Sequence, residues 1–205
     1  MGWNKFSLTA LLTSAICASN ANAVVIFGME VGKPISIPEC IKSGEFAGVI
    51  YSFRQVEVCW ATQDHEGVAA RNELASVNRD DSVFIIFPTG TRPSFVVHET
   101  LKALSIDGSI EEIHFDLDAK NFDAAYQTFL TKFGKPKSLS NIPVVNGIGI
   151  VFDNIQAQWK TDSVTISIEK RGRDINTGYA SIKSRIALDR DAVMVKKRSA
   201  KEQKL

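Results

Sequence analysis

The stretch NFDAAYQTFLTKFGKP, residues 121–136, contains the strongest secondary-structure signal in the chain. Apolar residues recur there at helical spacing, at Phe122, Ala125, Phe129 and Phe133. Asn121 precedes them as a candidate N-cap, and Gly134 followed by Pro136 is typical of a helix end. The stretch therefore predicts one main helix that packs on a larger structure through a single face.

Around this helix the sequence has the patterns of β-strands. SVFIIFP (82–88) is a continuous apolar run, and Asp107-Gly108 favours a tight hairpin turn between two further strands. After the helix, turn-prone residues separate four strand-like segments: GIGIVF (147–152), IQAQW (155–159), SVTISIE (163–169) and ASIKSRIAL (180–188). The expected fold class is α+β, an antiparallel sheet with one main helix.

The tripeptide Gly-Lys-Pro occurs twice, at residues 32–34 and 134–136, and similar segments follow each copy. GVIYSFRQVEVCW (48–60) aligns with GIGIVFDNIQAQW (147–159) without a gap, which matches Trp60 to Trp159. One interpretation is a tandem duplication of a unit of helix, Gly-Lys-Pro and strand meander. The other is that any two hairpins ending in Trp share alternation and turn residues. The sequence leaves both open.

The first 23 residues have the architecture of a secretory signal peptide. A single cation, Lys5, precedes an apolar stretch too short for a membrane span, and Ala21-Asn22-Ala23 is a small-x-small cleavage pattern. Cys17 does not follow a lipobox, so lipidation is not expected. Cleavage between Ala23 and Val24 would give a periplasmic or secreted protein.

Removing these 23 of the 205 residues leaves 182, with 23 cations and 23 acids, because the leader holds one Lys and no acid. This neutral balance argues against nucleic acid as the main partner. No later segment has the length and hydropathy of a transmembrane helix. Cys40 and Cys59 are the two remaining cysteines, and in an oxidising compartment they are expected to form a disulfide. Two free buried thiols are the alternative.

The domain organisation follows from these features. Residues 24–118 are expected to form a first subdomain with the disulfide and an inserted polar loop, 61–80. Residues 119–190 would form a second, a helix followed by an antiparallel meander. Residues 191–205 are charged without an apolar period, which predicts a flexible tail.

Two resemblances accompany this reading. FGMEVGKPISIPEC (27–40) resembles the opening of small exported proteins of Gram-negative bacteria that have no assigned activity. The outline of short helix, Gly-x-Pro and antiparallel strands with a Trp is similar to the β-lactamase-inhibitor-like fold. That fold implies inhibitors and envelope assembly factors, which act by binding protein, and it transfers no functional residue to this chain.

One segment has the residue types of a metal site. In EEIHFDLD (111–118), a strand would project Glu112, His114, Asp116 and Asp118 from one face. His114 and Asp116 are the candidate metal ligands, although the favoured interpretation is a solvated strand face. No catalytic residue and no cofactor site is predicted, because the motifs of nucleophile elbows, metallopeptidase helices and phosphate loops are missing from the sequence.

The function expected from the sequence is an exported binding or inhibitory module that acts on an unidentified protein partner without catalysis. The inserted loop 61–80 is the expected recognition surface, because loops carry recognition on a rigid scaffold. The alternative is an envelope hydrolase or metal-binding enzyme whose site is assembled from distant residues.

Overall fold

The computed structural model describes residues 24–41, 52–62, 82–172 and 174–202. The predicted signal peptide, 1–23, and all but the first two residues of the predicted inserted loop 61–80 lie outside these ranges. Within the described ranges, no helix combines the length and the apolar character needed to cross a membrane.

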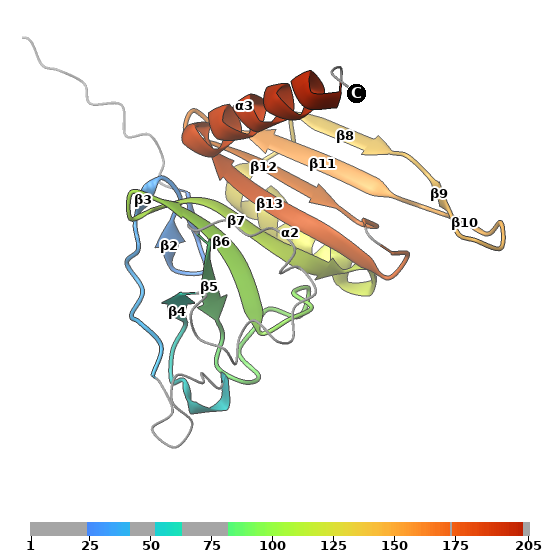
Figure 1. Ribbon diagram of the computed structural model, residues 1–205. Coiled ribbons are helices and arrows are strands. Elements are labelled where there is room, and N and C mark those ends of the chain that lie inside the picture. The colour runs from blue at the N-terminus through green and yellow to red at the C-terminus, as the bar shows by residue number, and fades with distance from the viewer. Residues whose placement is uncertain (1–23, 42–51, 63–81, 173, 203–205) are drawn as a thin grey trace, which may run out of the picture.

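A nine-stranded sheet organises the molecule (Figure 1). Eight strands follow one another in the order β4-β5-β6-β7-β13-β12-β11-β8, every pair antiparallel. Their bounds are Cys59–Thr62 (β4), Ser82–Ile86 (β5), Thr100–Ile106 (β6), Ser109–Asp118 (β7), Thr177–Ser184 (β13), Val164–Glu169 (β12), Ile155–Lys160 (β11) and Ser138–Asn141 (β8). The ninth, β3 (Lys33–Pro34), pairs with the beginning of β7.

Smaller elements complete the fold. Two hairpins lie outside the main sheet: β1 (Val25–Ile26) with β2 (Met29–Glu30), and β9 (Val144–Val145) with β10 (Val151–Phe152). The helices within the described ranges are η1 (Ser52–Arg54), η3 (Ala119–Asn121), α2 (Phe122–Phe133) and α3 (Arg185–Glu202). The predicted α+β class, with a mainly antiparallel sheet, is confirmed.

Helix α2 forms where the sequence predicts it. Phe122, Ala125 and Phe129 are its buried residues, and Gly134 (φ 72°) ends it while donating its N–H to the Leu130 carbonyl. The expected cap differs, because the Asn121 side chain makes no capping hydrogen bond. That side chain instead donates to Asp118 and to the Ser94 carbonyl, which ties the start of the helix to the neighbouring loop.

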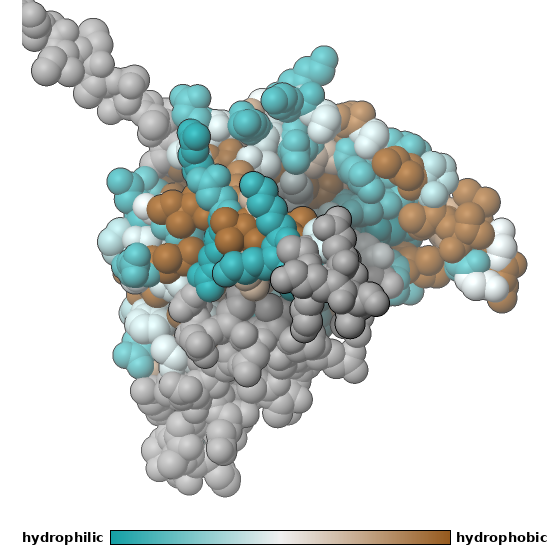
Figure 2. Space-filling model, turned by 45° about the horizontal axis from the view of Figure 1, so that its top comes forward, coloured by the Kyte–Doolittle hydropathy of each residue, from teal (hydrophilic) through white to brown (hydrophobic). Residues whose placement is uncertain are grey.

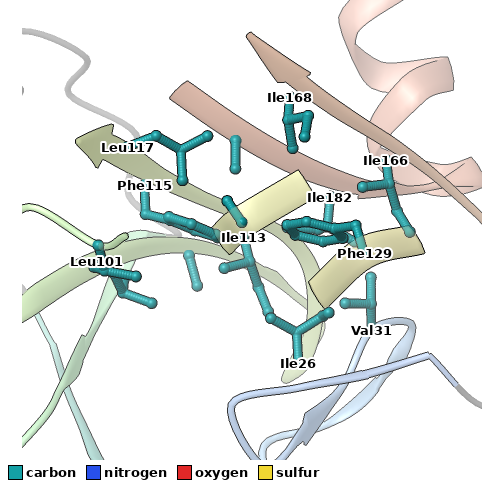
Figure 3. Packing of buried hydrophobic residues seen from close by; sticks show 14 of the residues in the cluster. Ile26, Val31, Leu101, Ile113, Phe115, Leu117, Phe129, Ile166, Ile168 and Ile182 are labelled. Atoms are coloured by element: carbon teal, nitrogen blue, oxygen red, sulfur yellow. The ribbon is translucent and has the colours of Figure 1, made fainter. Parts of the chain in front are cut away.

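The main core lies between the sheet and a layer formed by α2 and the β1–β2 hairpin. Figure 3 shows Phe129 of α2, and Ile26 and Val31 of the N-terminal segment, meeting sheet residues such as Ile113. The Trp159 ring packs 5.7 Å from the ring of Phe129 and donates its indole N–H to the Gly134 carbonyl at 2.7 Å. Helix and sheet are therefore joined by packing and by a hydrogen bond at one residue.

The opposite face of the sheet, called the outer face below, carries the disulfide. Cys40 and Cys59 are bonded, as predicted, and belong to a second small cluster with Ala61, Phe84 and Ile86. The Cys40 amide donates to the Trp60 carbonyl, and the Trp60 amide donates to the Pro38 carbonyl, each at 2.9 Å. The bridge therefore fastens the segment that covers the free edge of β4, apart from the main core.

The C-terminal part differs from the expectation. The segment 180–188, expected to be a strand, changes at Ser184 into a helix, and α3 occupies most of the region expected to be a tail. The Ser184 hydroxyl accepts the Ala187 amide at 3.2 Å, as an N-cap does. Residues with high helix propensity follow, but without a strong apolar stripe, so a periodicity argument misses this helix.

The boundary between β7 and β13 divides the eight-strand order into two halves of four strands. Counting outward from this boundary places β4 opposite β8 and β5 opposite β11. The alignment of Trp60 with Trp159 instead matches β4 to β11. The sequence similarity is thus displaced by one strand from this correspondence, and the tandem duplication stays a prediction.

Candidate functional site

The outer face changes from apolar to polar across the sheet. Strand pairing defines one continuous row of residues: Ala61, Phe84, Lys102, His114, Ser181, Ser167, Gln158 and Ser138. The apolar end of the row belongs to the disulfide cluster, and the rest is polar from β6 to β8. Polar side chains on alternate residues of each strand produce this face, as the sequence predicts for β7.

His114 and Asp116, the predicted metal candidates, do lie on this face. The His114 ring stacks on Tyr179 of β13 with centroids 6.0 Å apart, and His98 Nε2 lies 3.4 Å from Asp116 Oδ2. Burial lowers the pKa of His114 below 6.5, against the opposing charges of Asp116 and Glu112. Burial, together with a hydrogen bond to Glu169, raises the pKa of Tyr179 above 10.0.

The other two carboxylates of the predicted strand face have structural partners. Glu112 lies 3.2 Å from Lys183 Nζ, and Asp118 accepts the Lys120 amide at 2.9 Å. In the described parts of the chain, no three His, Cys, Asp or Glu side chains gather as metal ligands would. The metal assignment stays a prediction.

Lys183 connects the outer face to α3. Its ammonium lies between Glu112 of β7 and Asp191 of α3, 2.5 Å from the latter. Burial alone would lower the pKa of Lys183, but the hydrogen bond to Asp191 and the charge of Glu112 outweigh it, and the pKa is raised. Together with the Ser184 cap, which also donates to the buried Glu111, this contact fixes α3 at the end of the sheet.

Ser181 lies directly opposite His114 in the β7–β13 pairing. Its side chain is buried at 8% exposure, and its hydroxyl has no hydrogen-bond partner among the described residues. A serine nucleophile needs a base within hydrogen-bond reach. Ser181 and His114 are therefore neighbours, but they lack the hydrogen bond through which a histidine base activates a serine nucleophile.

An open pocket of about 750 Å³ lies where β7 ends and β13 begins. Its lining is mainly polar and comes from the 89–99 loop, η3 and the start of β13: Thr89, Gly90, Arg92, Ser94, Val96, Val97, Glu99, Asp118, Asn121, Asn176 and Thr177. Arg92 donates to the Val96 carbonyl, and Asp118 binds Lys120 and Asn121. Several polar groups of the pocket lining thus form hydrogen bonds that hold the surrounding loop in place. Sequence reasoning missed this pocket because its residues are dispersed.

Residues 142–152, named here the apolar arm, carry five exposed aliphatic side chains at a projecting end of the molecule (Figure 1). The arm comprises β9, β10 and their turn, extends past the ends of β8 and β11 in Figure 1, and holds no charged residue. Its side chains are exposed at Ile142 (54%), Val145 (62%), Ile148 (82%), Ile150 (50%) and Val151 (64%). Figure 2 shows this projecting end as a concentration of hydrophobic surface.

The arm is held in one conformation by polar contacts at both of its ends. At the tip, Asn146 Oδ1 accepts the Ile148 and Ile150 amides at 3.1 and 2.9 Å, and Gly149 adopts φ 85°. At the base, Arg171 lies over the Phe152 ring, and the buried Asn154 accepts the Arg171 amide. An exposed apolar surface is therefore presented by an ordered hairpin.

GIGIVF (147–152), predicted as part of the antiparallel meander, does not belong to the main sheet, so this prediction is wrong. Its β10 part pairs with β9 outside the main sheet, and β8, which was not predicted, occupies the edge beside β11. β8 has the sequence SLSN, without apolar alternation, so periodicity gives no signal for it. The uncharged run 142–152 was the available clue to the arm.

Residues 63–80 of the predicted recognition loop 61–80 lie outside the described ranges. Comparisons with protein-family models, with curated proteins and with solved structures each found no match to this chain. The two resemblances stated from the sequence stay predictions.

Proposed function

We propose that this chain is an exported, disulfide-braced binding module that recognises a protein partner through the apolar arm, as a binder or inhibitor. The observation that carries the proposal is the exposure of five aliphatic side chains on an uncharged, ordered hairpin. Contiguous exposed apolar surface on a folded protein is typical of interaction sites, because leaving it in water is unfavourable.

The arrangement of these side chains indicates the shape of the partner. Val145 and Val151 pair across the hairpin and expose apolar surface on the same face of the ribbon, and Ile148 and Ile150 expose it around the turn. A flat partner would cover that face alone, whereas a groove that admits the hairpin would cover both the face and the turn. Because the Asn146 contacts already order the turn, binding would lose little conformational entropy there.

Export is part of the same proposal. It rests on the leader pattern of residues 1–23 and the predicted cut between Ala23 and Val24. The bond between Cys40 and Cys59 supports it, since disulfides persist in oxidising compartments such as the periplasm or the extracellular space.

The alternative, an envelope hydrolase or metal-binding enzyme, would use the pocket or the outer face. Its supporting observation is the pocket of about 750 Å³, a volume suited to a small molecule. The lining groups Arg92, Asp118 and Asn121 are already bound to the surrounding backbone and to one another, which favours a structural role for them.

Site-specific photo-crosslinking tests the proposed function. A photoreactive residue replaces Ile148 of the arm or, as a matched control, Val56 before β4, whose side chain is equally exposed (82% and 84%). In envelope extract, position 148 should give a discrete adduct that excess unlabelled protein abolishes, and position 56 should not. Equal labelling from both positions, or no competed adduct from 148, would contradict the proposal.

A further inference from the structure

We infer that the free edge of β8 binds an extended strand of the partner, antiparallel to β8, with a carboxylate at the C-terminal end of that strand. This inference rests on the proposed function and adds the chemistry of the partner segment. It is drawn from the backbone of β8, from the charges at its two ends and from the contrast between the two edges of the sheet.

The two edges of the sheet are treated differently. Unpaired edge strands attract other strands, and proteins protect them with covering segments, charges or bulges. The β4 edge is covered by Pro38–Cys40, which the disulfide fastens. In the described ranges nothing pairs with the outer side of β8, and its four residues are exposed and uncharged.

The backbone of β8 offers hydrogen-bonding groups in a defined pattern. The Ile142 amide donates to the Asn154 carbonyl at 3.0 Å, which points the backbone of Ile142 toward the β11 side. Because inward and outward groups alternate along a strand, Ser138 and Ser140 also face β11, and Leu139 and Asn141 present their N–H and C=O groups outward. The Lys137 amide also faces β11, because it donates to the Gln158 carbonyl at 2.7 Å, and Pro143 follows Ile142. The outward groups are therefore those of Leu139 and Asn141, which pair with a segment of about four residues.

Three lysines lie near the beginning of this edge, whereas Asp153 and Arg171 lie at its other end, where the Asp153 carboxylate accepts from the Asn141 side chain and the Asp153 carbonyl accepts from Arg171. Lys135 and Lys137 precede β8, and Lys160 ends the neighbouring β11; all three side chains are exposed, and no ion pair is formed by them with a described residue. From Ser138 to Phe152 the edge and the arm carry no charge. A complementary strand is therefore neutral along its length and acidic where it meets the beginning of β8.

The direction of the strand follows from this polarity. Antiparallel addition continues the pattern of the sheet and places the C-terminal end of the incoming strand beside the three lysines. The carboxylate can come from the terminus of the partner chain or from Asp or Glu side chains near it. Both supply the same chemistry, an anion within reach of three ammonium groups, and the experiment separates them.

Fluorescence anisotropy with labelled octapeptides of alternating Thr and Val tests the inference on the full chain without its leader. One peptide ends in two Asp residues and an amide, a second in a free carboxylate, a third in a neutral amide, and a fourth carries the Asp pair at its N-terminus. We expect the first or second to bind about three- to tenfold more tightly than the third at low salt, with the difference reduced at high salt. The fourth should bind no more tightly than the third.

Three variants test whether the edge is the binding site. Leu139→Pro removes an outward-facing N–H, whereas Leu139→Thr removes the same side chain and keeps that N–H, so only the proline variant should lose binding. The triple variant Lys135→Gln, Lys137→Gln and Lys160→Gln should bind all four peptides equally and, as a surface change, leaves folding intact. Thermal unfolding of each variant serves as the folding check.

Several results would overturn the inference: equal binding of acidic and neutral peptides, unchanged binding by Leu139→Pro, or preference for the fourth peptide. A dimer in sedimentation that Leu139→Pro dissociates would assign the edge to a second copy of this chain and equally overturn it. The proposed function is judged separately. If position 148 still crosslinks but the peptides do not bind, strand addition is wrong and the proposed function stands. If the peptides bind but position 148 gives no competed adduct, the proposed function is wrong.

Discussion

Trp159 connects the helix to the sheet more completely than any other aromatic residue described above. Its side chain is 2% exposed, packs against Tyr126 and Phe129, and donates to the Gly134 carbonyl that ends α2. Trp60, its counterpart in the sequence alignment, is only partly buried against the same core. The two residues share a motif but differ in burial.

Replacement of Trp159 by Ala should lower the free energy of unfolding by about 3–5 kcal/mol, because a large cavity forms and the Gly134 carbonyl loses its donor. Trp60→Ala should lower the free energy of unfolding by clearly less. Urea denaturation of both variants measures the difference. Equal losses would show that the core does not depend on Trp159 in the way the packing indicates.

His114 should make stability dependent on pH. Its pKa is lowered in the folded state, so the folded chain holds the proton less tightly than the unfolded chain. The stabilisation is complete above about pH 6.5 and is lost as the pH falls from there through the folded pKa. The charges of Asp116 and Glu112 oppose this lowering of the His114 pKa, and the charges of Lys183 and Lys102 add to it.

Denaturant melts between pH 7.5 and pH 5 test this effect in the wild type and in His114→Gln. The wild type should lose more stability than the variant over this range, because the variant lacks the imidazole. If both lose the same amount, other groups control the acid sensitivity of the fold.

At the scale of elements, α3 depends on a small polar contact of Ser184, the residue that precedes it. The Ser184 hydroxyl accepts from Ala187 and donates to the buried carboxyl of Glu111. Ser184→Ala should cost about 1–3 kcal/mol, since it removes a helix cap and leaves Glu111 without this donor. Ser199→Ala in the same helix is the control, because Ser199 is exposed and, among the described residues, its hydroxyl donates to the Val195 carbonyl alone. An equal loss of thermal stability in both variants would contradict this role of Ser184.

Elements with a strong local signal could be predicted from the sequence, and elements that depend on tertiary context could not. The stripe of α2 and the Asp107-Gly108 turn, with φ of 50° and 77°, each specify their own conformation. β8 has no apolar alternation and exists because β11 offers it a partner. α3 lacks a strong apolar stripe, so the sequence analysis expected strand and tail there.

The candidate site could be predicted only in part for the same reason. The Cys40–Cys59 bond follows from the two cysteines that remain after removal of the predicted leader, and the polar face around His114 follows from strand alternation. The apolar arm could not be predicted without knowing that β10 lies outside the main sheet, because an apolar run such as GIGIVF is equally typical of a buried strand. The pocket brings together residues from position 89 to position 177, which no local pattern relates.

At the scale of the whole molecule, the disulfide closes one edge of the sheet while the other edge remains open. Cys40 and Cys59 are 19 positions apart, and their bond holds the covering segment on β4. The double variant Cys40→Ala and Cys59→Ala should lose about 3 kcal/mol in the free energy of unfolding. Because the main core is separate from this cluster, the arm should keep its structure and its crosslinking from position 148. Loss of that crosslinking in a folded variant would contradict this separation.

The most direct test of the central claim compares two deletions in the same binding measurement. In one, Asn-Gly replaces residues 143–152, which removes most of the apolar arm and keeps the Ile142–Asn154 hydrogen bond behind a three-residue turn. In the other, Gly-Ser residues replace 63–80, the loop that the sequence analysis favoured. Capture of the partner identified by crosslinking is then measured on both immobilised proteins. We predict that the arm deletion unfolds as cooperatively as the wild type and loses the partner, whereas the loop replacement retains it; partner binding by the arm deletion would contradict the account.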